Sequence, residues 1–511
     1  MTDSKTARGY MVFGGGSTMG IVGAGLFLVF AAASCSDNSG DKANACEGVT
    51  CSSHGTCKTA SSGGAFCSCD PGYEAVGLSC SSIGDGGQPQ TCTQDGHCDM
   101  EGGETVSNCP EDCAWVEVAC GRMHTCARRK DGSVWCWGDN TSMQLGRDSS
   151  ATPGSNRPVR VDLSHVLNAG DVPVGIQAGN DHTCAITSGE HVVCWGDNSF
   201  GQLGTADGDG ASLPLQVALG FHAGNGAVGG DNSCAVDVSS GSLYCWGNNG
   251  SSQVSGDGSN AVNPVYTPSV VHGVDWSQNR VDFITIGVGH ICTIMQDGGL
   301  LCWGHNSFGQ SNGAGSTAPI VPTWVAALPG GRVTWAAAGN GYTCAVLEQR
   351  ALYCWGDNSD GQCGNTDHLA TTLPAVLVAL SGNNMDHVTS VTAGMAHACA
   401  VVGPSGNDGH AHGKVYCWGS NENHALGRGE EEAGACGSTE VEAEDPAPIH
   451  APPGDPVFVQ VSVGWVHTCA VDDKGQIWCW GCNDAGELGF GAVGSMYGVP
   501  TKIGSPATDG S

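Results

Sequence analysis

Short runs of apolar residues, separated by Gly, Asn and Asp, recur along most of the chain. The segment 134–146 reads VWCWGDNTSMQLG, and six related segments follow it, each containing Cys-Trp-Gly. Apolar runs of this length between turn residues are typical of β-strands rather than helices. We therefore expect residues 115–504 to form short strands joined by tight turns.

The Cys-Trp-Gly segments repeat at intervals of 51 to 63 residues, a period that indicates a propeller or a solenoid. The short strands favour the propeller, and a ring of seven units leaves no open sheet edge. The expected fold class is all-β, a seven-bladed β-propeller. Strand alternation places each Trp on the sheet face opposite the Cys before it, where we expect it to fill the space between blades rather than to stack on a ligand. These residues are Trp137, Trp195, Trp246, Trp303, Trp355, Trp418 and Trp480.

The cysteine before each Trp has a partner in the same unit. In HTCARRKDGSVWCWG, Asp131 and Gly132 lie midway between Cys126 and Cys136, where a hairpin loop with a left-handed glycine would fit. That register places the two cysteines opposite each other, within reach of a disulfide. The same reasoning predicts one disulfide per blade: Cys126–Cys136, Cys184–Cys194, Cys234–Cys245, Cys292–Cys302, Cys344–Cys354, Cys399–Cys417 and Cys469–Cys479.

The repeat reads roughly V-x5-G-x2-H-T-C-A, a turn, and then x-V-x-C-W-G-x-N-x2-G-Q-L-G. It resembles the regulator of chromosome condensation repeat family over about 390 residues, and this resemblance implies a seven-bladed propeller. The match weakens at WGNNGSSQVSG and at WGSNENHALG. In this family a terminal strand can complete the first blade and close the ring. The segment VPTKI, near the end of the chain, is the candidate for that strand.

The N-terminus has the features of an export signal. Lys5 and Arg8 precede a long uncharged stretch whose apolar part, 19–34, ends in small residues. The sequence AASC, ending at Cys35, resembles the lipobox of bacterial lipoproteins. We expect a signal peptide at 1–34, lipid on Cys35 and a tether at 35–45. An uncleaved membrane anchor and plain secretion are the alternatives, and all three place the rest of the chain outside the cytoplasm, where disulfides persist. Ser36 lacks the acidic character of an inner-membrane retention signal, which favours the outer membrane or cell surface.

Residues 46–80 contain six cysteines, too many for so short a segment to fold without disulfides. Spacing alone permits fifteen pairings. The segment resembles an epidermal growth factor-like (EGF-like) module, including its CxC and DPGY motifs. That resemblance implies the disulfides Cys46–Cys57, Cys51–Cys67 and Cys69–Cys80. The preceding residues, DKANAC, do not match the calcium-binding subtype.

After a linker at 81–91, residues 92–113 form a four-cysteine acidic module, and residues 505–511 form a tail beyond the propeller. The module's carboxylates could bind calcium, but no ligand loop of known spacing is present, so a solvated spacer with two disulfides is preferred. They belong to Asp95, Asp99, Glu101, Glu104 and Asp112. Three pairings remain open for Cys120, Cys363, Cys436 and Cys482. Links of Cys363 to Cys436 and of Cys120 to Cys482 would join neighbouring blades.

A histidine stands two residues before the first cysteine in five repeats, at His124, His182, His290, His397 and His467. The spacing suits a metal ligand pair, but a disulfide sulfur is no longer a thiolate ligand. Asn232 and Tyr342 replace the histidine in two repeats, so we expect structural histidines. A weak surface metal site at His410, His412 and His424 is the alternative. The acidic run 430–445 is expected to be a solvated loop. No nucleophile elbow, phosphate loop or paired-carboxylate signature is found, which predicts a non-enzyme without cofactor or metal.

The formal net charge of −32 makes nucleic acid a poor partner. We expect a monomer, anchored to the membrane through its N-terminal lipid, that binds another envelope or extracellular protein. Relatives in the resembled family include a nucleotide exchange factor and propellers that inhibit β-lactamases, and both kinds act by protein contact. Export and acidity argue against exchange activity here. A structural envelope component, a polysaccharide-acting enzyme and a glycan-binding module remain as alternatives.

Overall fold

The computed structural model describes four short strands between residues 55 and 82 and then residues 109–504. Within the second range, the description omits residues 151, 317, 327, 366–371, 381–386, 404–412, 430–435 and 438–442. The chain divides into two compact units, Met1–Cys92 and Thr93–Ser511. Among the described residues, no helix combines the length and the apolar character needed to cross a bilayer.

The first unit contains two antiparallel strand pairs. β1 (Gly55–Thr59) pairs with β2 (Ala65–Cys69), and β3 (Tyr73–Val76) pairs with β4 (Ser79–Ser82). The disulfides expected from the EGF-like resemblance depend on side chains outside the described residues, as does the lipid site at Cys35.

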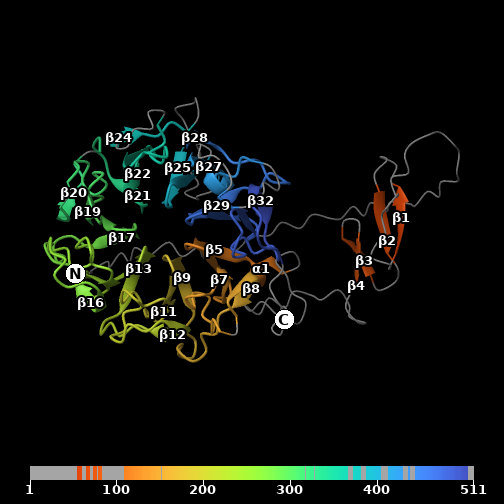
Figure 1. Ribbon diagram of the computed structural model, residues 1–511, viewed down its shortest axis with the longest axis horizontal. Helices are drawn as coiled ribbons and strands as arrows, with labels where there is room; N and C mark the ends of the chain where they lie inside the picture. Colours follow the sequence, from red (N-terminus) through yellow and green to blue (C-terminus); the bar gives the residue numbers. More distant parts are fainter. Residues whose placement is uncertain are drawn as a thin grey trace, which may run out of the picture. The chain divides into compact units, whose positions relative to one another are not determined.

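The second unit is a ring of seven four-stranded antiparallel sheets (Figure 1). Each sheet, or blade, uses four consecutive strands, and the first strand of each blade lies nearest the centre of the ring (Figure 1). Blade 1 contains β5–β8 (Trp115–Cys120, His124–Arg129, Val134–Asp139, Gly154–Arg160), and blade 2 contains β9–β12 (Pro173–Ala178, His182–Thr187, Val192–Gly196, Ala211–Gln216). Blade 3 contains β13–β16 (Ala223–Gly229, Asn232–Asp237, Leu243–Gly247, Val265–Val270), and blade 4 contains β17–β20 (Val281–Ile286, His290–Met295, Leu300–Gly304, Ile320–Trp324).

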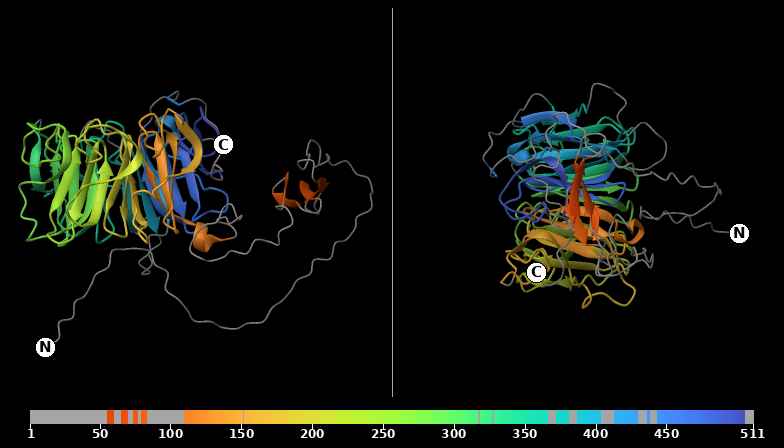
Figure 2. Two further views of the ribbon diagram at one scale, coloured as in Figure 1. Left: turned by 90° about the horizontal axis from the view of Figure 1, so that it is seen from below. Right: turned by 90° about the vertical axis from the view of Figure 1, so that its right-hand side faces the viewer.

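The remaining blades follow the same order around the ring. Blade 5 contains β21–β24 (Val333–Ala338, Tyr342–Leu347, Leu352–Gly356, Thr372–Leu377), and blade 6 contains β25–β28 (His387–Ala393, His397–Gly403, Lys414–Ser420, Ala443–Pro448). Blade 7 contains β29–β32 (Phe458–Val463, His467–Asp472, Ile477–Gly481, Tyr497–Lys502). Two single helical turns, α1 (Pro110–Cys113) and η2 (Glu422–His424), flank strands of blades 1 and 6. The side view in Figure 2 shows the blades standing next to one another.

The expected ring closure by strand exchange is wrong. β32, which contains VPTK, pairs with β31 and completes blade 7, while blade 1 is completed by its own fourth strand, β8. Each of the seven sheets is therefore continuous in sequence. VPTKI occupies in blade 7 the place that RPVRV occupies in blade 1, so the ring closes through contacts between two finished blades.

The prediction of one disulfide per blade is confirmed. In blade 1, Cys126 lies directly opposite Cys136 with a Cα–Cα distance of 4.1 Å, and Gly132 takes the left-handed conformation, with a φ of 83°. The hairpin register thus determines which cysteines can bond. The seven bridges are Cys126–Cys136, Cys184–Cys194, Cys234–Cys245, Cys292–Cys302, Cys344–Cys354, Cys399–Cys417 and Cys469–Cys479.

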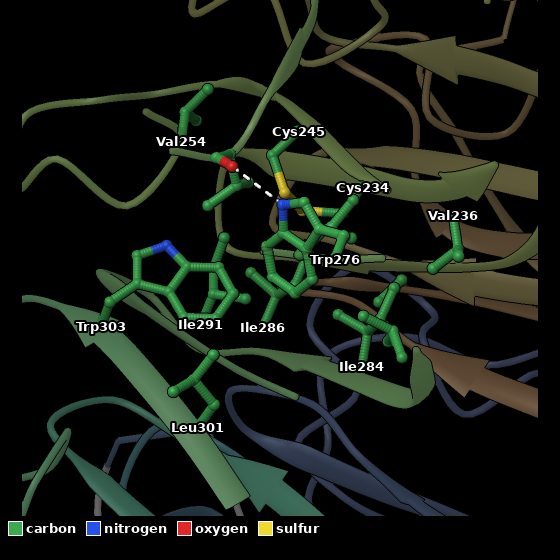
Figure 3. Close-up of a cluster of buried hydrophobic side chains, with 14 of the residues drawn as sticks. Cys234, Val236, Cys245, Val254, Trp276, Ile284, Ile286, Ile291, Leu301 and Trp303 are labelled. Carbon is green, nitrogen blue, oxygen red and sulfur yellow. Dashed lines mark hydrogen bonds between the residues drawn. A yellow bond between two sulfur atoms is a disulfide. The ribbon is translucent and has the colours of Figure 1, made fainter. Parts of the chain in front are cut away.

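The hydrophobic core lies between the blades. Figure 3 shows the cluster between blades 3 and 4, where Trp303 packs among aliphatic side chains such as Ile291 and Leu301. A further indole, Trp276, donates a hydrogen bond of 3.0 Å to the carbonyl of Val271. All seven Cys-Trp-Gly tryptophans are fully buried, which confirms their expected packing role.

Candidate functional site

A chain of hydrogen bonds joins each blade to the next. Between blades 4 and 5, Nε2 of His290 lies 2.8 Å from the hydroxyl of Thr343, which donates to the carbonyl of Gln310 at 2.8 Å. The same carbonyl accepts the indole N–H of Trp355 at 2.9 Å. Because the hydroxyl proton is used on the carbonyl, the imidazole must donate through Nε2. The repeated His, Thr, Trp and Gln residues therefore connect neighbouring blades.

Four other interfaces carry the same histidine–hydroxyl link, at His124–Thr183, His182–Ser233, His397–Thr468 and His467–Thr125. Burial lowers the pKa of His290 to about 3 and that of His182 to about 4, so these imidazoles are neutral at neutral pH. The ring is accommodated by a glycine, since a Cβ at Gly287 would lie 2.8 Å from Cε1 of His290. The histidines thus act as structural groups.

Two interfaces lack the histidine–hydroxyl link. At each of them the histidine of one blade and the hydroxyl residue of the next blade are both replaced. Asn232 of blade 3 faces an interface where blade 4 carries Ile291 instead of Thr, and both are buried. In the same way, Tyr342 of blade 5 is matched by Ala398 of blade 6, and the phenol donates instead to the carbonyl of His397 at 2.7 Å. This pairing was visible in the sequence only as two separate departures from the repeat.

The cysteines outside the blade hairpins pair differently from the expectation. Cys436 bonds to Cys482, so that the loop after β27 of blade 6 is tied to the end of β31 of blade 7. The expected links of Cys363 to Cys436 and of Cys120 to Cys482 are therefore wrong. Cys120 and Cys363 are buried and form no disulfide. The number of cysteines in the sequence could not distinguish between these pairings, because it carries no information about which loops lie together.

Cys120 lies in a group that resembles a metal site. Its Sγ, a ring nitrogen of His467 and Sγ of Cys469 lie within 4.8 Å of one another. Cys469 is bonded to Cys479, so its sulfur offers no thiolate. Burial raises the pKa of the Cys120 thiol to about 12, which keeps it protonated. The group is thus a packed part of the interface between blades 7 and 1.

The first strand of each blade presents an open edge to the central channel, and side chains of the preceding blade cover several of these edges. Gln460 of blade 7 accepts from Val118 N–H at 2.9 Å and donates to Val118 O at 3.2 Å. Gln177 makes the equivalent pair of bonds to Val228 and Gly226 in blade 3. Such contacts remove free pairing groups from strand edges, which would otherwise attract other chains.

One face of the propeller carries a group of carboxylates close to the ends of its strands. We define the channel-mouth face as the loops that join first to second and third to fourth strands within the blades. Antiparallel pairing places all these loops on the same face. Four of its carboxylates in blades 1 to 3 lie at or next to strand ends, and we call these the acidic arc: Asp139, Asp181, Asp197 and Asp231.

The acidic arc contains one bidentate ion pair. Arg122 reaches Asp181 with contacts of 3.1 Å and 2.7 Å, and Asn180 donates to Asp231 at 2.8 Å. Burial raises the pKa of Asp181, and the neighbouring Asp139 carboxylate adds to that rise, while Arg122 opposes it. Burial likewise raises the pKa of Asp231. Negative charge in this arc is therefore incompletely compensated.

The rest of the mouth includes an apolar arc, which we define as Val288, Met395 and Trp465 from blades 4, 6 and 7. Val288 is 36% exposed and Met395 is 37% exposed. The indole of Trp465 is held by a 3.1 Å hydrogen bond to Asn180, with the Arg122 guanidinium 5.6 Å from its ring centroid. The mouth thus combines the acidic arc with exposed apolar side chains on a fixed frame.

Several predicted residues lie outside the described part of the chain. These include His410, His412 and most of the acidic run 430–445. Of the four-cysteine module, Cys109 and Cys113 are described and disulfide-bonded, and Asp112 is buried. His424 lies in η2, without a second described histidine from its expected group.

Comparison with known proteins places this architecture in a family. The model of the RCC1-like domain matches residues 79–403, and two models of the regulator of chromosome condensation (RCC1) repeat match residues 412–471 and 458–487. The chain belongs to the RCC1-repeat family. Its matched region covers most of the ring, in agreement with the repeat read from the sequence.

RCC1-repeat relatives with known names cover much of the propeller. The ultraviolet-B receptor UVR8 of Arabidopsis thaliana is 28% identical over 378 residues, which is 73% of this chain and 78% of the receptor. The human E3 ubiquitin-protein ligase HERC2 is 24% identical over 372 residues, covering 71% of this chain and 7% of the ligase. This chain therefore spans only a small part of HERC2.

Solved structures show the same fold. Yeast RCC1 (Prp20), solved with Kap60, has a TM-score of 0.60 at 22% identity, covering 73% of this chain and 84% of that chain. Human WBSCR16 has a TM-score of 0.57 at 21% identity, and the match covers 70% of this chain and 87% of WBSCR16. At these identities the likeness establishes the propeller fold alone.

Proposed function

We propose that this RCC1-repeat protein is an exported, lipid-anchored protein of the cell envelope whose propeller binds another protein through the channel-mouth face. The observation that carries the binding proposal is the combination of the acidic arc with exposed apolar side chains on one face. Protein interfaces use apolar contacts for affinity and charged groups for specificity and association rate.

The rigidity of the frame supports a binding role. Each blade is closed by its own disulfide, and five interfaces carry a buried histidine–hydroxyl link. A surface that is already ordered loses little conformational entropy on binding. The relatives named above are a light receptor and a ubiquitin ligase, so family membership leaves the choice of partner to the surface residues.

Export is supported by the disulfides and by the N-terminal sequence. Disulfides in every blade suit an oxidising compartment. The test of anchoring is incorporation of labelled palmitate into the full-length chain. We expect label and membrane association in the wild type and loss of both in Cys35→Ala. Label retained in the variant would contradict the lipidation site.

The test of binding uses the oxidised ectodomain, residues 46–511, immobilised and exposed to solubilised envelope proteins. A reduced and alkylated ectodomain is the control, because it loses the frame while keeping the composition. Saturable capture by the oxidised form alone supports the proposal. Equal capture by both forms, or none by either, would contradict it and favour a structural or glycan-directed role.

A further inference from the structure

The Gln of the repeat's GQLG segment has a constant role in the structure. In blade 1, Oε1 of Gln144 accepts the N–H of Ser142 at 2.9 Å and its Nε2 donates to Asp139 at 2.9 Å. Gln202 of blade 2 makes the same pair of bonds, with Asp197 as its acceptor. The amide thus fixes its own loop, whose carbonyl receives the Trp of the next blade.

Blade 7 carries Glu487 in this place. Its Oε2 accepts the N–H of Ala485 at 2.8 Å, as the Gln oxygen does. Its Oε1 takes the position of the amide nitrogen and has no hydrogen-bond partner in the described structure. The residue equivalent to Asp139 is Cys482, which is bonded to Cys436. A protonated Glu487 side chain is uncharged, as the Gln side chain is in the other blades. An ionised Glu487 would place a negative charge at a buried position without a hydrogen-bond partner for Oε1.

The charged groups that face Glu487 oppose its ionisation. Asp484 lies on its own loop and Asp139 faces it from blade 1. His467 of β30 is neutral, since burial lowers its pKa to about 3, and its Nε2 is engaged by Thr125. Burial, with a smaller contribution from Asp484 and Asp139, raises the pKa of Glu487 to about 8. The side chain therefore keeps its proton at neutral pH.

Glu487 is also central to the seam, which we define as the interface between blades 7 and 1. Its backbone carbonyl accepts both the Trp137 indole N–H and the Thr125 hydroxyl, each at 2.8 Å. Other links across the seam include the side-chain bonds of Gln460 to Val118 and of Ser462 to Cys120, and a backbone bond of 3.0 Å from Trp115 N–H to Gly475 O. No shared strand crosses the seam, so these bonds and the buried cluster between the two blades hold it together, and the Glu487 loop contributes two of the bonds.

We propose that Glu487 is a protonation-controlled latch that holds the seam closed when it carries a proton and loosens the seam when it loses that proton. Opening would hydrate the carboxyl and return it to its ordinary pKa, near 4.5. An acid whose pKa is raised in the closed state stabilises that state fully below its ordinary pKa. This stabilisation is lost as the pH rises towards about 8. Within that window the opening equilibrium rises by about tenfold per pH unit.

The test is amide hydrogen exchange of the full chain between pH 6.5 and 8, expressed as protection factors so that intrinsic exchange is removed. In this range the interface histidines are neutral in the closed state, and a histidine exposed by opening is at most about half protonated, so their contribution is small and opposite in sign. We expect protection of the Val118 and Cys120 amides to fall by up to about tenfold per pH unit, while Val228 at the blade 2–3 interface stays constant. In Glu487→Gln the protection factors of the seam amides should no longer change with pH.

Gln202→Glu gives an independent test, because it places a carboxyl at the blade 2–3 interface opposite Asp197. In this variant we expect the hydrogen-exchange protection of the Val228 amide to become dependent on pH. The rate of alkylation of Cys120 provides a second measurement. At each pH the rate in the wild type is divided by the rate in Glu487→Gln, so that the effect of thiol ionisation cancels. This ratio should rise between pH 6.5 and 8. Seam protection that is independent of pH in the wild type, or equally dependent in Glu487→Gln, would overturn the proposal.

Discussion

Nε2 of His467 lies 2.8 Å from the hydroxyl of Thr125, and this contact joins the last blade of the ring to the first across 342 residues of sequence. The same pair of groups links four other neighbouring blades. Ring closure therefore uses the ordinary inter-blade link rather than an exchanged strand. The interface that closes the ring is therefore built like four of the interfaces between blades that are consecutive in sequence.

The histidine–hydroxyl pair should show strong coupling. Thr343→Val leaves Nε2–H of His290 buried without an acceptor, and we expect a loss of about 1–3 kcal/mol in unfolding free energy. The double variant His290→Asn with Thr343→Ile copies the natural pair Asn232 and Ile291. Urea unfolding of the two single variants and the double should show that the double costs less than their sum. Additive losses would contradict the coupling.

The disulfide between blades should contribute more stability than a disulfide within one blade. Cys436–Cys482 closes a separation of 46 residues, whereas Cys126–Cys136 closes 10. The chain-entropy relation gives about 4 and about 3 kcal/mol respectively. Denaturant unfolding of the Cys436→Ala/Cys482→Ala and Cys126→Ala/Cys136→Ala variants measures the difference. An equal or reversed ranking would show that native strain or residual structure outweighs loop length.

Acid should destabilise the propeller through its interface histidines. Burial lowers the pKa of His182 to about 4, whereas an unfolded histidine titrates near about 6.5. The unfolded chain therefore binds the extra proton, so stability is full above about pH 6.5 and falls as the pH decreases towards 4. His182→Asn should reduce the slope of unfolding free energy between pH 6 and 4.5 by about 1.4 kcal/mol per pH unit. The exposed His222 gives the control variant His222→Asn, which makes the same substitution at the surface instead of at a blade interface.

Cys120 should be unreactive in the folded protein. Its thiol is buried at the seam, and burial raises its pKa to about 12. We expect no labelling by a thiol reagent at pH 7 in native buffer and full labelling in denaturant without reductant. Rapid native labelling would show that the seam is already open at neutral pH. Peptide mapping identifies the labelled cysteine in either case.

The sequence was sufficient to predict features that depend on short-range register. The blade number follows from the Trp spacing, and each hairpin disulfide follows from the turn between its two cysteines, as at Gly132 between Cys126 and Cys136. Each hairpin disulfide is determined by the register of two neighbouring strands, where strand geometry leaves few alternatives.

Features that depend on how blades meet were not predictable in the same way. The pairing of Cys436 with Cys482 requires that two long loops lie together. The replacement of Thr by Ile291 can be explained only together with Asn232, which lies at the same interface. The sequence shows Glu487 only as a change from Gln in the last repeat, and its burial at the seam becomes visible only in the structure. A comparison of each repeat position with the same position one blade later could have found the paired replacements.

The central claim is that the channel-mouth face binds a partner protein, and paired surface variants test it most directly. Val288→Asp with Met395→Asp alters the apolar arc, and Val238→Asp with Val457→Asp alters residues of similar exposure, 39% and 40%, in loops of the opposite face. Partner capture by the oxidised ectodomain is measured for both, with thermal melting as a check on folding. We expect capture to be lost in the first pair and retained in the second. Capture retained in the first pair, or lost only in the second, would contradict it.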